Sequence, residues 1–390
     1  MAHKKFSAQH IFNGYEILNG DYVLITDEAG IIQEIIAAKD AGDNVQFFNG
    51  LLSPGFINCH CHLELSHMKG LIPEKTGLVD FVFKVVTERH FSEDEIEDAI
   101  AKGENEMLAN GIVAVGDICN NLSTLPQKLK QLIAYYNFIE VTGWLPQVAQ
   151  TRFEKGKLLY DAFAKNFERK TSIVPHAPYS VSQQLWKLIN PCFEEKTITI
   201  HNQETSCEDD LFKTNEGDFL RMYKMMNIAN NDFVPTGKSS LQSCFSEMNN
   251  AKNILLVHNT FTKEEDVLFI KKQSSGSYFC ICINANLYIE NEVPPVNMFL
   301  KNNCKIVLGT DSLASNHSLN LLDEIKSIGK HFPEISLQQL LQFATINGAN
   351  ALQMNNRFGS FEKGKQPGIL LIDKIENENI TADSFVKRLL

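Results

Sequence analysis

The sequence lacks a continuous hydrophobic segment of membrane-spanning length. A membrane helix needs about 20 apolar residues in succession, and no stretch of the 390 residues approaches that length. The N-terminal residues, MAHKKFSAQHIFNGYEIL, also lack the apolar core of a secretory signal peptide. We therefore expect a cytoplasmic protein with no membrane partner.

The sequence also lacks an excess of basic charge and any Cys-x-x-Cys spacing. Its 36 Lys and Arg residues against 47 Asp and Glu residues give a net charge of -11, which argues against nucleic acid as a partner. The nine cysteines fit reduced thiols better than a disulfide framework. A small-molecule substrate is the expected partner, and a homodimer is expected only from the general frequency of such assemblies.

Internal repeats and low-complexity segments are absent as well, but strands and helices alternate along the chain. Eight apolar runs rich in β-branched residues are separated by helical segments, which indicates βαβ units. The runs are residues 55–60, 111–117, 134–141, 172–176, 197–202, 253–258, 277–283 and 304–310. They predict an α/β fold with a TIM-like (β/α)8 barrel over residues 51–353.

Both ends of the chain have a different character. Residues 22–26, 31–36 and 45–48 alternate between apolar and polar residues and are separated by turn sequences. Near the C-terminus, glycines punctuate the apolar run 369–372. We expect a small β-sandwich domain formed by both termini, residues 1–50 and 354–390.

Two of the predicted barrel helices carry start signals. Ser92-x-x-Glu95 precedes the helix expected over 95–109, and Ser336-x-x-Gln339 precedes the helix expected over 339–352. Each pattern predicts a capping box, in which side chains satisfy free backbone donors at the helix start.

The strongest chemical signal is a His-x-His pair at the end of the first predicted barrel strand. Side chains alternate along a strand, so His60 and His62 share one face while Cys59 and Cys61 share the other. Two imidazoles at this spacing can chelate one ion, although a chance pair of surface histidines is the competing interpretation. We expect the cysteines to pack rather than to bind metal.

His201 and Asp311 also follow predicted strands. Taken singly, His201 reads as a core histidine and Asp311 as a helix cap. The carboxyl ends of barrel strands converge on one mouth, so with His60 and His62 these residues are predicted to hold one divalent ion, which could be zinc, Fe(II) or Mn(II). No lysine ends the fourth strand to form the carbamate of a two-metal site.

Three further side chains are predicted to face the same mouth. His176 and His258 end the fourth and sixth strands, and each can bind metal, polarise water or contact substrate. Glu64, two residues after His62, is expected to contact a ribose or a base edge. A surface or supporting carboxylate is the competing interpretation for Glu64.

Together, these residues resemble the deaminase and chlorohydrolase branch of the amidohydrolase superfamily. The matching segments span most of the chain in order: PGFINCHCHLELS, PHAPYSVS, HNQET, LVHN, LGTDSLASN, NGANAL and RFGSFEKGKQPG. The resemblance implies a barrel with a small sheet from both chain ends. It also implies a mononuclear site with His60, His62, His201 and Asp311 as ligands.

The resemblance also implies roles for the other residues. Glu204 would carry a proton to a ring nitrogen of the substrate, and His258 would hold and help deprotonate the attacking water, with Asp311 sharing that proton. His176 would contact the substrate. The segment 282–288 departs from the branch pattern Cys-Pro-Arg-Ser-Asn-Leu but keeps Asn286, which is also expected at the substrate.

Within the branch, residues 62–66 and 211–219 are most similar to aminodeoxyfutalosine deaminases. These enzymes remove the 6-amino group of an adenosine-like intermediate of menaquinone synthesis. The resemblance thus implies hydrolytic deamination of a purine or adenosine-like substrate. The alternatives are hydrolysis of a chlorinated triazine, deamination of guanine, and a non-catalytic scaffold. The loops 65–87 and 207–217 are expected to set specificity.

Overall fold

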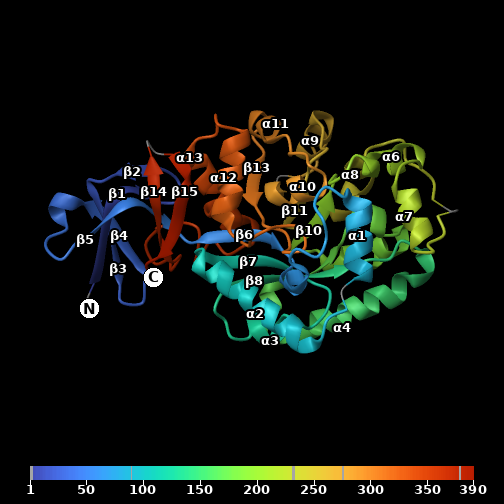
Figure 1. Cartoon of the computed structure of the whole chain (residues 1–390), viewed down its shortest axis with the longest axis horizontal. Coiled ribbons are helices and arrows are strands. Elements are labelled where there is room, and N and C mark those ends of the chain that lie inside the picture. Colours follow the sequence, from blue (N-terminus) through green and yellow to red (C-terminus); the bar gives the residue numbers. More distant parts are fainter. Residues whose placement is uncertain (1–2, 89, 231–232, 275, 377–378) are drawn as a thin grey trace.

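The computed structural model describes residues 3–88, 90–230, 233–274, 276–376 and 379–390. A barrel of parallel strands surrounded by helices makes up most of the molecule, and a smaller sheet lies at its left in Figure 1. The fold class expected from the sequence is confirmed. Within these ranges, we find no helix with both the length and the apolar character needed to span a bilayer.

The barrel of the described chain has eight parallel strands in two four-stranded sheets. The first sheet has the order β6 (Phe56–Cys61), β7 (Ile112–Cys119), β8 (Ala134–Val141) and β9 (Thr171–Pro175), and the second has the order β10 (Thr197–Asn202), β11 (Asn253–His258), β12 (Ser277–Ile281) and β13 (Lys305–Leu308). Each of the eight predicted runs overlaps one of these strands.

Backbone hydrogen bonds join the two sheets where their carboxyl ends meet. The His201 amide donates to the His176 carbonyl at 2.9 Å, which connects β10 to the end of β9. On the other side, the amides of Thr310 and Asp311 donate to the His60 carbonyl at 3.1 Å. Both junctions therefore involve residues of the predicted metal site.

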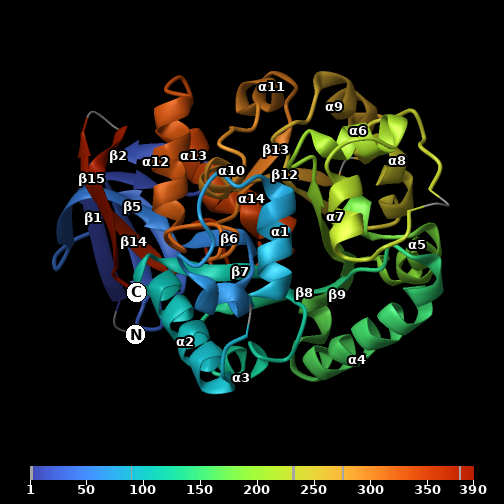
Figure 2. The ribbon, with the colours of Figure 1, turned by 45° about the vertical axis from the view of Figure 1, so that its right-hand side comes forward.

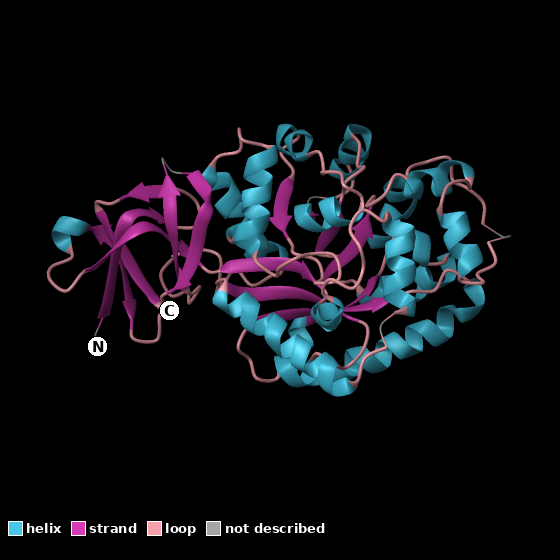
Figure 3. Cartoon of the chain, in the orientation of Figure 1, coloured by secondary structure: helices cyan, strands magenta, loops and turns pink. Residues whose placement is uncertain are grey.

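The strands are buried on both faces, as expected for a parallel sheet enclosed by helices. Every residue of β7 and of β10 is buried. Helices cover the outside of the barrel (Figure 3). They are α1 (Leu78–Thr87), α2 (Glu93–Ala109), α3 (Leu125–Lys128), α4 (Ala149–Phe167), α5 (Gln183–Ile189), α6 (Cys207–Thr214), α7 (Phe219–Met225), α8 (Ser240–Cys244), α9 (Glu264–Lys271), α10 (Ile283–Ile289), α11 (Val296–Lys301), α12 (Leu321–His331), α13 (Leu337–Ala344) and α14 (Ile346–Ala351).

Both predicted capping boxes are present, at Ser92 before α2 and at Ser336 before α13. The helix expected over 339–352 is instead two helices, α13 and α14, which break at Thr345 (φ -130°, ψ -93°). After the break, α14 packs directly on β6. A Cβ added to Gly348 would lie 3.0 Å from side-chain atoms of Ile57 and Cys59, so this close approach requires glycine.

Strands from both ends of the chain share one seven-stranded sheet. Its order is β15 (Asn379–Arg388), β14 (Ile369–Glu376), β5 (Gln46–Pro54), β1 (His3–Phe12), β3 (Tyr22–Asp27) and β4 (Ile32–Ala37), with β2 (Ile17–Asn19) paired to β1. β14 runs antiparallel to β5, and Ile369 pairs with Pro54. β5 continues past residue 50, and the domain boundaries stay a prediction.

A buried ion pair lies beside the carboxyl ends of β6 and β7. The side chains of Lys128 and Asp117 are both 0% exposed, and Lys128 Nζ lies 2.5 Å from Asp117 Oδ2. Burial opposes the charged form of Lys128, but Asp117 keeps its pKa above the ordinary value. Asp117 Oδ1 also accepts a hydrogen bond from the Leu63 amide at 2.9 Å. The pair therefore fixes the backbone next to His62.

We expect Lys128→Met to lower the free energy of unfolding by about 3–5 kcal/mol, because it leaves the Asp117 carboxylate buried without a counter-charge. Urea denaturation followed by circular dichroism measures this change. The matched control is Lys157→Met, which breaks the exposed pair between Lys157 and Asp161 at 2.7 Å and should cost less than about 1 kcal/mol. Equal changes in the two variants would contradict a structural role for the buried pair.

Candidate active site

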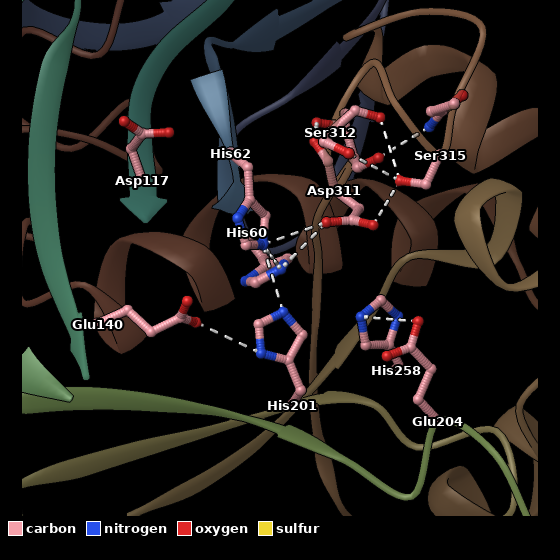
Figure 4. Close-up of polar contacts among 12 residues, drawn as sticks. His60, His62, Asp117, Glu140, His201, Glu204, His258, Asp311, Ser312 and Ser315 are labelled. Atoms are coloured by element: carbon pink, nitrogen blue, oxygen red, sulfur yellow. Dashed lines mark hydrogen bonds and ion pairs between the residues drawn. The ribbon is translucent and has the colours of Figure 1, made fainter. Parts of the chain in front are cut away.

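The four side chains predicted to bind a metal ion meet at the mouth of the barrel (Figure 4). Their metal-binding atoms are called donor atoms below. His60 lies in β6, His62 follows it, His201 lies in β10, and Asp311 comes shortly after β13. His62 Nε2 lies 3.2 Å from His60 Nε2 and 3.3 Å from His201 Nε2. Asp311 Oδ1 lies 3.4 Å from Nε2 of both His60 and His62. The structure thus brings together all four predicted ligands.

These separations match those expected for four ligands that bind one ion in tetrahedral geometry. Ligand bonds of about 2.0–2.1 Å at tetrahedral angles place the donor atoms roughly 3.3–3.4 Å from one another. Four of the six separations among these atoms are 3.2–3.4 Å. The donor set of three nitrogens and one carboxylate oxygen therefore fits one divalent cation in both chemistry and spacing.

The protonation of these residues points to the same conclusion. Burial lowers the pKa of His62 to about 3 and that of His201 well below its ordinary value, and the neighbouring imidazoles add to both shifts. His201 Nδ1 donates to the His176 carbonyl at 2.9 Å, so its Nε2 directs a lone pair at the cluster. Although burial opposes it, the surrounding histidines hold the pKa of Asp311 well below normal. The cluster therefore presents lone pairs and one negative charge.

The backbone at the mouth adopts a conformation that residues other than glycine rarely take. His258 has a φ of 73°, Asp311 of 57° and Gln203 of 44°. The left-handed region costs an ordinary residue on the order of 1–2 kcal/mol. Such strain is concentrated at functional sites, where the surrounding structure enforces it. Here it occurs directly after β10 and β13 and at the last residue of β11.

His258 and Glu204 lie on one side of the cluster (Figure 4). His258 Nε2 is 3.5 Å from Glu204 Oε1. Burial lowers the pKa of His258 to about 4, against the opposing effect of Asp311, so the ring is neutral at pH 7. Burial, with Asp311 and Glu208 nearby, raises the pKa of Glu204 well above its ordinary value. A neutral base thus stands next to a carboxyl group whose surroundings favour its protonated form.

The backbone that carries Glu204 is held by another buried carboxyl group. Glu208, at the start of α6, accepts hydrogen bonds from the amides of Gln203 at 3.0 Å and Glu204 at 2.9 Å. Its own position is fixed by Ser240, whose hydroxyl donates to Oε2 at 3.1 Å. These bonds orient Glu204 before any ligand binds.

A cavity of about 450 Å³ opens above the cluster. His62, His201, His258 and Asp311 form its polar floor. Its walls are mostly apolar and come from α1, from the segment after β8 and from α7, through Leu78, Phe81, Val82, Val85, Val86, Trp144, Leu145, Val148, Met222, Tyr223 and Met226. The cavity therefore suits a ligand with a polar reacting end and an apolar body.

Helices α1 and α7 lie close together over the mouth (Figure 2). An ion pair joins them, with Arg221 Nη1 2.7 Å from Asp80 Oδ1. Of the two loops expected to set specificity, residues 65–87 contribute to the cavity wall through Leu65 and α1. Residues 207–217 contribute none of the lining side chains, and α7 supplies that wall instead.

The other predicted site residues differ in their placement. Glu64 and His176 line the cavity, and His176 Nδ1 pairs with Ser180 Oγ at 2.9 Å. Asn286 is not among the lining residues. It lies behind His258, with Oδ1 3.4 Å from His258 Nδ1, because its position is set by α10 rather than by a strand end. The structure therefore places Asn286 beside His258, and its contact with a substrate stays a prediction.

Glu140 and Asn120 are among the polar cavity residues that were not anticipated from the sequence. Glu140 lies near the end of β8, and its Oε1 is 3.6 Å from His201 Nδ1. Asn120 follows β7, and its Nδ2 donates to Glu140 Oε2 at 3.1 Å. The available signal was a single carboxylate within the otherwise apolar run Ala134–Val141, since an ionisable residue inside a buried strand needs a partner or a ligand.

Comparison with known proteins gives consistent results. The model of the amidohydrolase family matches residues 51–388. A 5'-deoxyadenosine deaminase of Methanococcus vannielii is 25% identical over 380 residues, which cover 92% of this chain and 84% of the relative. A 5-methylthioadenosine/S-adenosylhomocysteine deaminase of Teredinibacter turnerae is 25% identical over 339 residues, which cover 83% and 72% of the two chains.

A solved structure has the same fold over nearly its full length. The aminofutalosine deaminase of Helicobacter pylori, in complex with methylthio-coformycin, superimposes with a TM-score of 0.82 and 22% sequence identity. The match covers 97% of this chain and 93% of that protein. At this identity the likeness shows a shared fold.

We expect purified protein to contain about one divalent ion per chain by elemental analysis. His60→Ala and Asp311→Ala should each lower the metal content, because a site with three donors left binds the ion less tightly. His331→Ala, at an exposed histidine at the end of α12, is the control and should retain the ion. Two tightly held ions per chain would contradict a mononuclear site.

Proposed function

The chain belongs to the amidohydrolase family and is a hydrolase of carbon–nitrogen bonds, and from this premise we propose that it removes the amino group from the purine ring of an adenosine-like substrate. The contact between Glu204 and His258 beside the four donors carries this proposal. It places a proton donor and a neutral base at the position where a ring nitrogen and a water molecule would meet. The deaminases among the similar proteins support the same chemistry.

We propose that the four donors His60, His62, His201 and Asp311 hold one zinc ion. Three imidazoles and a carboxylate suit zinc, and the same set accommodates Fe(II) or Mn(II). When bound, such an ion supplies Lewis-acid activation of water at neutral pH. Ser315 Oγ donates to Asp311 Oδ2 at 2.5 Å, which leaves Oδ1 directed at the cluster.

Residues of the chain carry out the proton transfers of the reaction. Glu204 donates its proton to the ring nitrogen beside the amino-bearing carbon, so that negative charge does not accumulate there as water adds. The neutral ring of His258, with Asp311, accepts the proton that the attacking water loses. That proton passes to the amino group, so the carbon–nitrogen bond breaks and ammonia leaves, and the second proton of the water returns to Glu204 as the ring carbonyl forms. His258 keeps its orientation through Asn286, which holds Nδ1 on the far side of the ring.

The shape of the cavity favours a substrate larger than a free base. A volume of about 450 Å³ exceeds what a purine ring alone would fill. The apolar walls from α1 and α7 lie away from the polar floor and suit an apolar group attached to the sugar. We propose 5'-modified adenosines as the substrate class, with 6-aminodeoxyfutalosine as the specific candidate.

Glu204→Gln should retain the metal and the fold but lower kcat/KM by roughly 10²–10⁴-fold, because the amide has no acidic proton to donate. Steady-state assays of ammonia release measure this effect, and elemental analysis of the same samples confirms the metal content. Glu216→Gln, at an exposed carboxylate after α6, is the control and should behave as wild type. Near-normal turnover by Glu204→Gln would remove this residue from the reaction.

A substrate panel tests the proposed reaction itself. We expect ammonia release from one or more of 6-aminodeoxyfutalosine, 5'-deoxyadenosine, S-adenosylhomocysteine and adenosine, with little from guanine and no chloride from a chlorinated triazine. The apolar walls should make 5'-modified nucleosides better substrates than adenosine. Absence of ammonia with every nucleoside would refute the purine-deaminase assignment, and chloride release would favour the chlorohydrolase alternative.

A further inference from the structure

Two buried carboxyl groups on the cavity wall have no role in the reaction above. The exposed fractions of Glu64 and Glu140 are 3% and 8%, and both line the cavity. Asn120 lies between them. Its backbone amide donates to Glu64 Oε2 at 3.0 Å, and its side-chain amide donates to Glu140 Oε2 at 3.1 Å. We refer to Glu64, Asn120 and Glu140 as the carboxyl subsite.

Asn120 satisfies only one oxygen of each carboxyl group. Glu140 Oε1 is buried and accepts no hydrogen bond from the part of the chain that the structure describes. The imidazole of His201 lies nearby, at 3.6 Å, but its Nδ1 proton is already donated to the His176 carbonyl. A buried carboxyl oxygen without a donor is costly, so the arrangement is complete only when a ligand supplies that donor.

Burial raises the pKa of Glu64 and of Glu140 to about 7, so above neutral pH both groups are ionised and accept hydrogen bonds from a ligand that supplies donors. Vicinal hydroxyl groups offer two O–H donors a short distance apart, and a carboxylate in nucleotide-binding folds commonly accepts from the hydroxyls of ribose. Figure 4 shows Glu140 and Glu204 on opposite sides of the histidine cluster. A nucleoside whose ring reaches Glu204 spans the floor of the cavity between them.

We propose that Glu64 and Glu140, held in place by Asn120, bind the 2' and 3' hydroxyl groups of the substrate sugar. This inference rests on the proposed function and deepens it, because it makes the intact ribose a determinant of specificity. The subsite selects nucleosides over free bases. It does so without taking part in the proton transfers at Glu204 and His258.

The alternative interpretation is that this part of the cavity wall binds a second cation. Glu140, His176 and His201 offer donor atoms within 4.8 Å of one another. However, His201 Nδ1 faces the His176 carbonyl, and His176 Nδ1 pairs with Ser180 Oγ at 2.9 Å. That leaves one oxygen of Glu140 and Nε2 of His176, fewer than the three protein ligands of a typical metal site, which favours a hydroxyl donor over a metal ion.

The test compares kcat/KM for adenosine or 5'-deoxyadenosine, whichever is deaminated faster, with that for its 2'-deoxy and 3'-deoxy forms. For the wild-type protein we expect loss of a hydroxyl to lower kcat/KM roughly 10- to 100-fold, in the range of a hydrogen bond to a charged group. In Glu64→Gln and Glu140→Gln this preference should fall several-fold for at least one hydroxyl. In Glu140→Ala it should approach one.

Because each preference is a ratio measured on one preparation, partial misfolding of a variant does not affect it. Glu154→Gln, on the exposed face of α4, is the control and should keep the full preference. All variants should retain about one metal ion per chain. Metal loss in Glu140→Gln would overturn the inference in favour of a role at the ion.

Equal deamination of the intact and deoxy nucleosides by the wild-type protein would overturn the hydroxyl assignment while leaving the deaminase function intact. Wild-type preference that persists unchanged in all three carboxyl variants would also overturn it. If no nucleoside is deaminated, the proposed function fails first. These results are distinguishable from one another in a single set of assays.

Discussion

The structure depends on the close approach of four electron-rich atoms. The Nε2 atoms of His60, His62 and His201 and Oδ1 of Asp311 lie within 3.4 Å of their neighbours, a spacing that a positive charge at the centre would stabilise. Hydrogen bonds hold these residues from outside, through the His176 carbonyl, the barrel junction at His60 and the Asp117–Lys128 pair. The barrel therefore keeps these four side chains close together, an arrangement that they would not adopt in a flexible chain.

Burial divides the ionisable groups of the cavity by their charge. The pKa values of His62, His201 and His258 are lowered and that of Glu204 is raised, so the surroundings favour the neutral form of each group. Asp311 stays ionised because the histidines surround it. Because these side chains are buried, electrostatic interactions between them are screened less than at the surface. Burial also lets a carboxylic acid and an imidazole base coexist within 3.5 Å.

Much of this arrangement could be predicted from the sequence, because it follows from short-range rules. Alternation along a strand aligns His60 with His62, and convergence of strand ends brings in His201 and Asp311. Other features depend on contacts that spacing does not reveal. The role of Glu140 follows from its contact with Asn120 and from its place in the cavity wall. The position of Asn286 is set by α10. The break at Thr345 accompanies the packing of α14 on β6, and β14 pairs with β5 from a distant part of the chain.

The shared sheet has a consequence for how the chain matures. β5 pairs with β1 on one edge and with β14 on the other, and β14 is synthesised only after the whole barrel. During translation, β5 therefore presents an open edge while the barrel assembles. Unpaired edges are templates for association with other chains. A ribosome that stalls before β14 would release a barrel with an adhesive edge, so the final strands protect the protein against aggregation although they lie apart from the catalytic chemistry.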